Sequence, residues 1–270
     1  MRKRKMEIIA ICAVCIGAFW LNGCRKKEIA KPEAAEEETT QDTKEDEKKK
    51  APDDVEKIIS AMQKTMALPS FDSHTEALIN LKGTFIKGEY SARSDIEIVQ
   101  GSDAGDFQMT MVSTSDFDST PAKAYYKDGW YYTDDKNGKQ KIEKTADDVM
   151  ENINTATELV TSAAENIDQI QVSVEGENQV YTYHIPEYLA EEYLERLAQS
   201  AADSTQLQGA AADVEQLEMI STVNPKGLLV KQEMVLSGSV KKSIIKVPVN
   251  VSVTATFKEC AKRQLDIPEF

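Results

Sequence analysis

The sequence has few of the residues from which catalytic and metal sites are usually built. It contains two histidines, His74 and His184, and four cysteines among 270 residues. It lacks the Gly-x-Ser-x-Gly, His-Glu-x-x-His, phosphate-loop and dinucleotide-binding motifs. A Ser–His–acid triad is defined by geometry and not by sequence order, so the sequence leaves that arrangement open. We predict a protein that is not an enzyme, with no catalytic residue, no metal ligand and no cofactor.

Positive charge is also scarce. The chain has 46 Asp and Glu against 32 Lys and Arg, which gives a formal net charge of −14. Binding to phosphates requires a basic face, so we predict no nucleic-acid partner. The acidic excess is typical of a soluble surface. The pairs Asp134-Asp135 and Asp147-Asp148 fit a turn and a helix start; an acid-catalysed hydrolase would need two carboxylates that converge in a cleft.

Long apolar runs are missing except near the N-terminus. A basic segment, Arg2–Lys5, precedes 14 uncharged residues, Ile8–Leu21. This run is shorter than the roughly 20 apolar residues of a membrane-spanning helix. Its length is that of the hydrophobic region of a signal peptide. Residues 1–23 are therefore predicted to be a signal peptide.

The segment Leu21-Asn22-Gly23-Cys24 resembles the lipobox of bacterial lipoproteins, with Asn22 as a departure from the usual pattern. The resemblance implies that Cys24 receives a diacylglycerol and becomes the mature N-terminus. Two acyl chains are enough for stable anchoring. The chain is then expected on the extracytoplasmic face of a cell membrane, with the membrane as its first partner. The alternative is an ordinary signal peptide, or an uncleaved signal anchor, in which Cys24 is incidental.

Cleavage would leave Cys260 as the only unmodified cysteine, because Cys12 and Cys15 belong to the signal peptide. No disulfide framework within the chain is then possible. Cys260 is interpreted as a spare residue near a strand end, with a reactive thiol as the alternative. Stability must come from packing.

Residues 24–54 contain no aromatic residue and carry the charged blocks Glu36–Glu38 and Lys44–Lys50. So little apolar surface cannot offset the entropy of ordering, and we predict a disordered tether. About 30 residues of flexible chain span on the order of 30 Å. The segment is interpreted as a spacer through a cell wall, or as a tolerated low-complexity stretch.

Apolar periodicity from residue 55 onward predicts alternating blocks of helix and strand. A helical stripe runs from Val55 to Met66, and Leu68-Pro69 ends it. From about His74 the period changes from 3.6 to 2, which indicates half-buried antiparallel strands. Asp128-Gly129, between two tyrosine-rich runs, predicts a tight hairpin. Its aromatic residues, Trp130 included, are interpreted as cross-strand packing, with glycan or peptide recognition as the alternative.

The second half repeats this succession. One long helix is expected from Thr145 to Ile167, opened by a capping box of Thr145 and Asp148. Two strands, a helix beginning at Pro186 and three or four strands follow. In the last strand, alternate residues from Ile245 to Phe257 are apolar, so one face meets a core and the other meets water.

These blocks predict an α+β fold, in which amphipathic helices cover one face of an antiparallel sheet. A single domain over residues 55–270 is expected. Together with the lipobox, the charged tether, the aromatic hairpin and the strands after Asn224-Pro225-Lys226-Gly227, this pattern resembles the LolA/LppX–LprG superfamily, as found in uncharacterised lipoproteins of Gram-positive bacteria. The resemblance implies a curved half-barrel whose concave face, partly plugged by helices, can hold acyl chains.

Two functions follow from these expectations. The first is a carrier or sensor of a hydrophobic ligand, such as an acyl chain or lipid, held between sheet and helices. The second is a surface module without a cavity, which binds cell-wall material or a protein partner. Fold alone does not decide between them. The sequence identifies no ligand-binding residue, and its one candidate site residue is the lipid-anchor position, Cys24.

Overall fold

The computed structural model describes residues 53–83, 87–101, 106–116, 118–136, 138–153, 155–191, 210–242 and 245–268. The predicted signal peptide, Cys24 and the predicted tether up to residue 52 lie outside these ranges. Asp53 and Asp54 open the first described helix. No helix within these ranges is long and apolar enough to cross a membrane.

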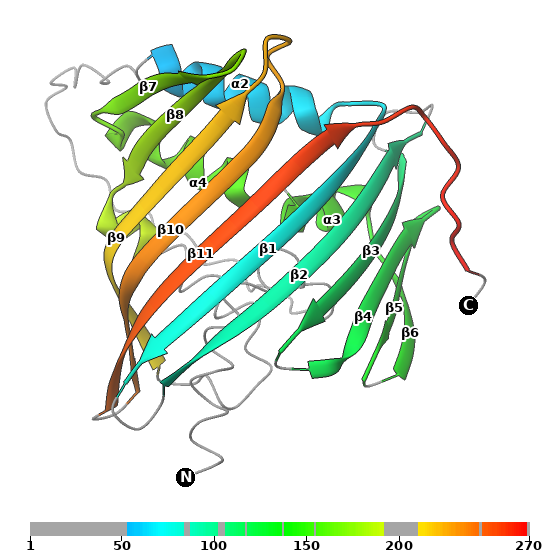
Figure 1. Cartoon of the computed structure of the whole chain (residues 1–270). Helices are drawn as coiled ribbons and strands as arrows, with labels where there is room; N and C mark the ends of the chain where they lie inside the picture. The colour runs from blue at the N-terminus through cyan, green and yellow to red at the C-terminus, as the bar shows by residue number, and fades with distance from the viewer. Residues whose placement is uncertain are drawn as a thin grey trace, which may run out of the picture.

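A single antiparallel sheet forms most of the described chain, which makes the fold mostly β (Figure 1). Its eleven strands, counted within the described ranges, lie in the order β6-β5-β4-β3-β2-β1-β11-β10-β9-β8-β7. The strands are β1 (Ser70–Lys82), β2 (Lys87–Gln100), β3 (Phe107–Ser115), β4 (Asp118–Lys127), β5 (Trp130–Asp135), β6 (Gly138–Glu143), β7 (Ile170–Glu175), β8 (Asn178–Ile185), β9 (Ala210–Val223), β10 (Leu229–Lys242) and β11 (Ile245–Glu259).

The first and last strands of the domain pair at the centre of the sheet. In β1 and β11, Thr75 lies opposite Ala255 and Ile79 lies opposite Val251. Strands β1 to β6 form one meander and β7 to β11 form the other, so this single pairing joins the two halves. The strands of the described ranges therefore form one continuous sheet.

The helices lie together on one side of the curved sheet, which we call the inner face (Figure 1). They are α2 (Asp53–Met66), α3 (Ala146–Ile153), α4 (Thr155–Ala163) and the short 3-10 helix η1 (Ala164–Asn166). A further helical stretch, 187–191, follows Pro186 as predicted, and the rest of that expected helix lies outside the described residues. The predicted fold class, a curved antiparallel sheet with helices on its concave face, is confirmed.

The expected long helix from Thr145 to Ile167 corresponds to α3 and α4, which flank residue 154 outside the described ranges, and it ends in the 3-10 helix η1. The predicted capping box is present, because Thr145 N–H donates to Asp148 and Asp148 N–H donates to the Thr145 hydroxyl, each at 3.1 Å.

Strand alternation places the core as the sequence predicts. Along β11, Val247, Val249, Val251 and Val253 are buried on the inner face, while Lys246 is exposed on the outer face. The aromatic hairpin is also confirmed, since Asp128 and Gly129 have φ angles of 51° and 79°. Those positive angles are the ones a two-residue primed turn requires.

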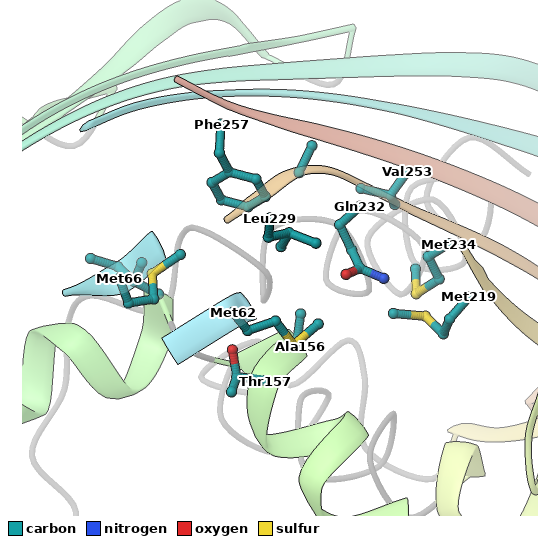
Figure 2. A pocket seen from close by; sticks show the side chains of 12 residues that line it. Met62, Met66, Ala156, Thr157, Met219, Leu229, Gln232, Met234, Val253 and Phe257 are labelled. Carbon is teal, nitrogen blue, oxygen red and sulfur yellow. The ribbon is translucent and has the colours of Figure 1, made fainter. Parts of the chain in front are cut away.

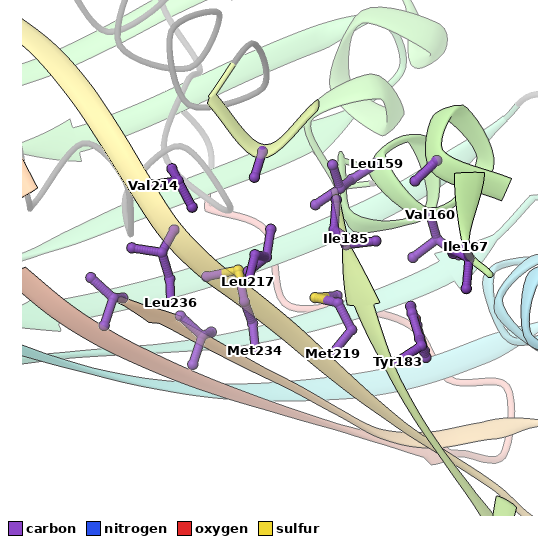
Figure 3. Packing of buried hydrophobic residues seen from close by; sticks show 14 of the residues in the cluster. Leu159, Val160, Ile167, Tyr183, Ile185, Val214, Leu217, Met219, Met234 and Leu236 are labelled. Atoms are coloured by element: carbon purple, nitrogen blue, oxygen red, sulfur yellow. The ribbon is translucent and has the colours of Figure 1, made fainter. Parts of the chain in front are cut away.

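Two apolar clusters fill the inner face. The larger joins α2 and α4 to β1 and β8–β11, and Figure 3 shows Leu159 and Val160 of α4 above Tyr183, Met219 and their neighbours. The smaller joins α3 to β1–β5, with Val149 among Ile98, Met109 and Tyr126. The helices are thus held to the sheet by apolar contact.

Candidate functional site

The candidate site is an apolar pocket between the inner face and the helices (Figure 2). Four methionines line it: Met62 and Met66 from α2, Met219 from β9 and Met234 from β10. Ala156 and Thr157 close it from α4. The amphipathic stripe of α2 and the period-2 pattern of the strands place these side chains on facing surfaces.

The pocket is small in this structure. Its volume is about 30 Å³, which is room for a water molecule or two. Pockets that hold ligands of drug size typically measure about 300–1,000 Å³. Space therefore exists where the resemblance implied it, but an acyl chain enters only if the helices or the methionine side chains move.

A row of polar and small side chains crosses the inner face through this pocket. The strand registers place one residue of each strand directly opposite the next along the whole row. We call it the polar row: Tyr181 (β8), Ser221 (β9), Gln232 (β10), Ala255 (β11), Thr75 (β1), Ser94 (β2) and Ser113 (β3). Its serine, threonine and glutamine side chains are all buried.

Gln232 is the polar side chain of the pocket wall. The Ser221 hydroxyl donates to Gln232 Oε1 at 3.1 Å, and the Tyr183 hydroxyl lies 3.0 Å from Ser221 Oγ. A serine hydroxyl has one proton, so Tyr183 must donate to Ser221. This chain fixes the amide orientation. Gln232 Nε2 then has no hydrogen-bond partner among the described residues, and Figure 2 shows the amide reaching among Met62, Met219 and Met234.

Three hydroxyl groups of β1 also lack a hydrogen-bond partner among the described residues. Ser70 Oγ, Ser73 Oγ and Thr75 Oγ1 are buried, and within the described part of the chain none has a partner. Each such group costs about 1–3 kcal/mol when it is left unsatisfied. Ser94 and Ser113, further along the polar row, bond to one another at 3.0 Å. Two of the unsatisfied groups therefore belong to the row: Gln232 in the pocket wall, and Thr75 two strands away from it.

The buried phenol of Tyr183 gives a prediction on pH. Burial raises the pKa of Tyr183 to about 12, against 10.0 for a free side chain. Because the folded pKa is the higher one, this stability is present below pH 10 and is lost as pH rises toward 12. The loss amounts to roughly 2–3 kcal/mol. Chemical denaturation between pH 9 and pH 12 should show this fall, and Tyr183→Phe should flatten it; an equal slope in the variant would contradict the prediction.

The two histidines do not meet. His74 lies on the outer face of β1, with Nδ1 2.6 Å from Asp95 and Nε2 3.6 Å from Glu76. The hydrogen bond to Asp95 raises the pKa of His74. His184 lies on the outer face of β8, 3.8 Å from Glu218, and three strands separate β8 from β1. Neither side chain faces the pocket.

The other residues singled out in the sequence, Cys260 and the aromatic residues of the hairpin, make contacts that stabilise the fold. Cys260 follows β11, with Sγ 3.1 Å from Asp72, and Arg263 bridges Asp72 and Glu97. In the hairpin, Tyr125 and Tyr126 lie opposite Tyr132 and Tyr131, as expected for cross-strand packing. Lys141 lies 4.6 Å above the Trp130 ring. Within the described ranges, no group of His, Cys, Asp or Glu could hold a metal ion.

The polar row is the feature of the candidate site that sequence reasoning missed. Ser73, Thr75 and Ser94 occupy inner-face positions where the pattern calls for apolar residues. The available signal was this interruption of otherwise regular strands. It becomes meaningful only when the registers place the interruptions side by side.

The geometry defines a curved single-sheet protein with an apolar pocket beneath its helices. No protein-family model matches the sequence, and no curated protein matches it. Among solved structures, it is similar to LprF from Mycobacterium bovis, at 10% identity and a TM-score of 0.39, covering 82% of this chain and 98% of that one. It is similar to the lipoprotein LppX from Mycobacterium tuberculosis, at 12% identity and a TM-score of 0.40, covering 79% and 97%.

A third similar structure is described as an outer membrane lipoprotein-sorting protein domain from Vibrio parahaemolyticus. Its identity is 10% and its TM-score is 0.24, with 76% of this chain and 92% of that one covered. These are likenesses of structure, without a match between sequences.

Proposed function

We propose that the protein is a lipoprotein anchored through Cys24 to the extracytoplasmic face of a membrane, where it carries or senses a hydrophobic ligand such as an acyl chain or lipid. The ligand site is the pocket between the inner face and the helices α2 and α4. The observation that carries the proposal is the methionine lining of an apolar pocket that also holds an unsatisfied amide. The proposal includes no catalytic step.

Methionine is suited to a pocket that changes volume. Its unbranched side chain has three rotatable bonds and a polarizable sulfur, so it adapts to irregular space and is common at surfaces that accept varied partners. Four of the pocket residues are methionines, contributed by one helix and two strands. Rotamer changes in these residues, with an outward shift of α4, would enlarge the pocket without breaking the sheet.

Helix α4 is the element best placed to move. It lines the pocket with the small or β-branched residues Ala156 and Thr157, while the buried Leu159 and Val160 pack it against the sheet. Small side chains bury little apolar area, and each square ångström of apolar area contributes only about 25 cal/mol. The part of α4 at Ala156 and Thr157 should therefore separate from the sheet at low cost, while Leu159 and Val160 keep the helix attached.

The volume of about 30 Å³ favours the second candidate, a surface module with a filled core. The two candidate functions differ in whether the protein contains a bound ligand when it is purified from cells. A carrier should retain a ligand, whereas a filled module should be empty.

Native mass spectrometry of the full chain, purified from bacterial membranes in a mild detergent, tests the proposal. We expect a mass shift equal to one acyl lipid that persists after detergent release, and the lipid should appear in an organic extract. The lipid covalently attached to Cys24 is distinguished because it survives denaturation. A chain that is always free of noncovalent lipid would contradict the carrier and support the filled module.

A further inference from the structure

The amide of Gln232 sits where it can select one chemical class of ligand. Its side chain is 6% exposed and belongs to the pocket wall. The bond from Ser221 holds Oε1, so the two N–H donors of Nε2 are turned away from that bond and have no partner in the described chain. A ligand with an acceptor oxygen can form a hydrogen bond with a donor fixed in this way, whereas a hydrocarbon leaves the donor unsatisfied.

The rest of the polar row extends the same chemistry along one line. Thr75 lies two strands from Gln232, with Ala255 between them. Neighbouring strands are about 4.8 Å apart, so the two unsatisfied groups are separated by roughly 10 Å. Apolar residues flank the row: Met234 and Val253 on one side, Leu229 and Phe257 on the other. This arrangement fits an amphiphilic ligand. Its polar linking group would lie against the row, and its hydrocarbon chain would lie against the apolar residues beside the row.

The charge of the side chains that line the pocket limits the chemical class of the ligand further. None of the described residues that line it is Lys, Arg or His. A carboxylate or phosphate in this space would be desolvated without a counter-charge, which is strongly unfavourable. A neutral carbonyl requires only a hydrogen-bond donor.

We infer that the pocket selects a neutral acyl ester or amide, whose carbonyl oxygen accepts a hydrogen bond from Gln232 Nε2, over a free fatty acid or a plain hydrocarbon. This inference rests on the proposed carrier function and names the ligand class for the same pocket. Gln232 acts as a specificity residue by direct contact with the ligand. Ser221 and Tyr183 position its amide.

Photocrosslinking of the full chain tests the inference. The protein is placed in nanodiscs of ether-linked phospholipid, which contain no acyl carbonyl to compete. Three probes of sixteen carbons, each with a diazirine in the chain, are compared: a methyl ester, a free fatty acid and an alkane. The variant Gln232→Met removes the donors and keeps the length of the side chain. Gln216→Leu, at an exposed position of β9, is the matched control, and Gln232→Leu is a second variant of different shape.

The wild type should prefer the ester to the alkane by about threefold to tenfold, the range of one hydrogen bond. Both Gln232 variants should lose this preference and label with the alkane as the wild type does, which also shows that they are folded. The control should keep the preference. An undiminished preference in the Gln232 variants overturns the inference, as does equal labelling of the wild type by ester and alkane, because a water molecule alone then satisfies the amide. Stronger labelling by the free fatty acid overturns it too. If no probe labels the wild type, the carrier function itself fails.

Discussion

Replacing Thr65 with valine should lower the free energy of unfolding by about 4 kcal/mol, although valine has nearly the same shape. Thr65 is 1% exposed and lies in the last turn of α2. Its hydroxyl accepts from Leu229 N–H at 2.9 Å and donates to Leu229 C=O at 3.2 Å. One side chain thus satisfies both backbone groups of a buried residue at the start of β10.

The size of this effect follows from what valine leaves behind. Two buried backbone groups lose their partner at once, and each costs about 1–3 kcal/mol when unsatisfied. The same bonds fix the C-terminal end of α2 against β10, beside the pocket residues Met62 and Met66. Loss of Thr65 should therefore loosen the helix that forms one wall of the site.

Urea unfolding at neutral pH checks this prediction, with Thr65→Ser as the matched control. Serine keeps the hydroxyl and loses one methyl group, so it should cost only about 1 kcal/mol. If valine destabilises the protein no more than serine does, the two hydroxyl bonds contribute no more than the methyl group and the prediction is wrong.

The local elements could be predicted best where a strand has one face in a core and the other in water. In β11 the valines at alternate positions signal a strand and also its buried face. The same reasoning placed the turn at Asp128-Gly129, where positive φ angles favour those residue types. Sequence spacing is sufficient in such cases, since the pattern and the structure it reports are both local.

The pairing of β1 with β11 could not be predicted in this way. Thr75 and Ala255 are neighbours in the sheet but far apart in the chain, and an apolar pattern does not identify its partner strand. The start of β1 was missed for a related reason: the strand was expected from about His74 but begins at Ser70. Ser73 and Thr75 are buried on the inner face, and polar residues at inner-face positions interrupt the alternation that indicates a strand.

The same interruption hides the candidate site. A buried serine or glutamine that lacks a partner is costly for folding, so such residues tend to be retained where they contact something else. Viewed singly, Gln232 and Thr75 are ordinary polar residues of a half-exposed strand. Only the register across β10, β11 and β1 makes them parts of one row, and only the helices enclose that row.

Filling the pocket should abolish ligand capture. Ala156 lies on α4 and faces Met219 and Met234 across the pocket (Figure 2). Ala156→Phe would place an aromatic ring in the space that a ligand needs, and would add apolar contact between α4 and the sheet. A ligand would then have to displace the ring, so we expect retention of noncovalent lipid to fall at least about tenfold. Overpacking should cost about 1–3 kcal/mol of stability.

Ser162→Phe is the matched control, because it adds the same ring at an exposed position of the same helix. The lipid content of both variants and the wild type is measured by native mass spectrometry, alongside urea unfolding to show that all three are folded. Equal lipid content in the two variants would mean that the ligand lies elsewhere on the inner face. Loss of lipid in Ala156→Phe alone would establish that a chain must pass between α4 and β9–β10, and hence that the small volume seen here is the closed form of the site.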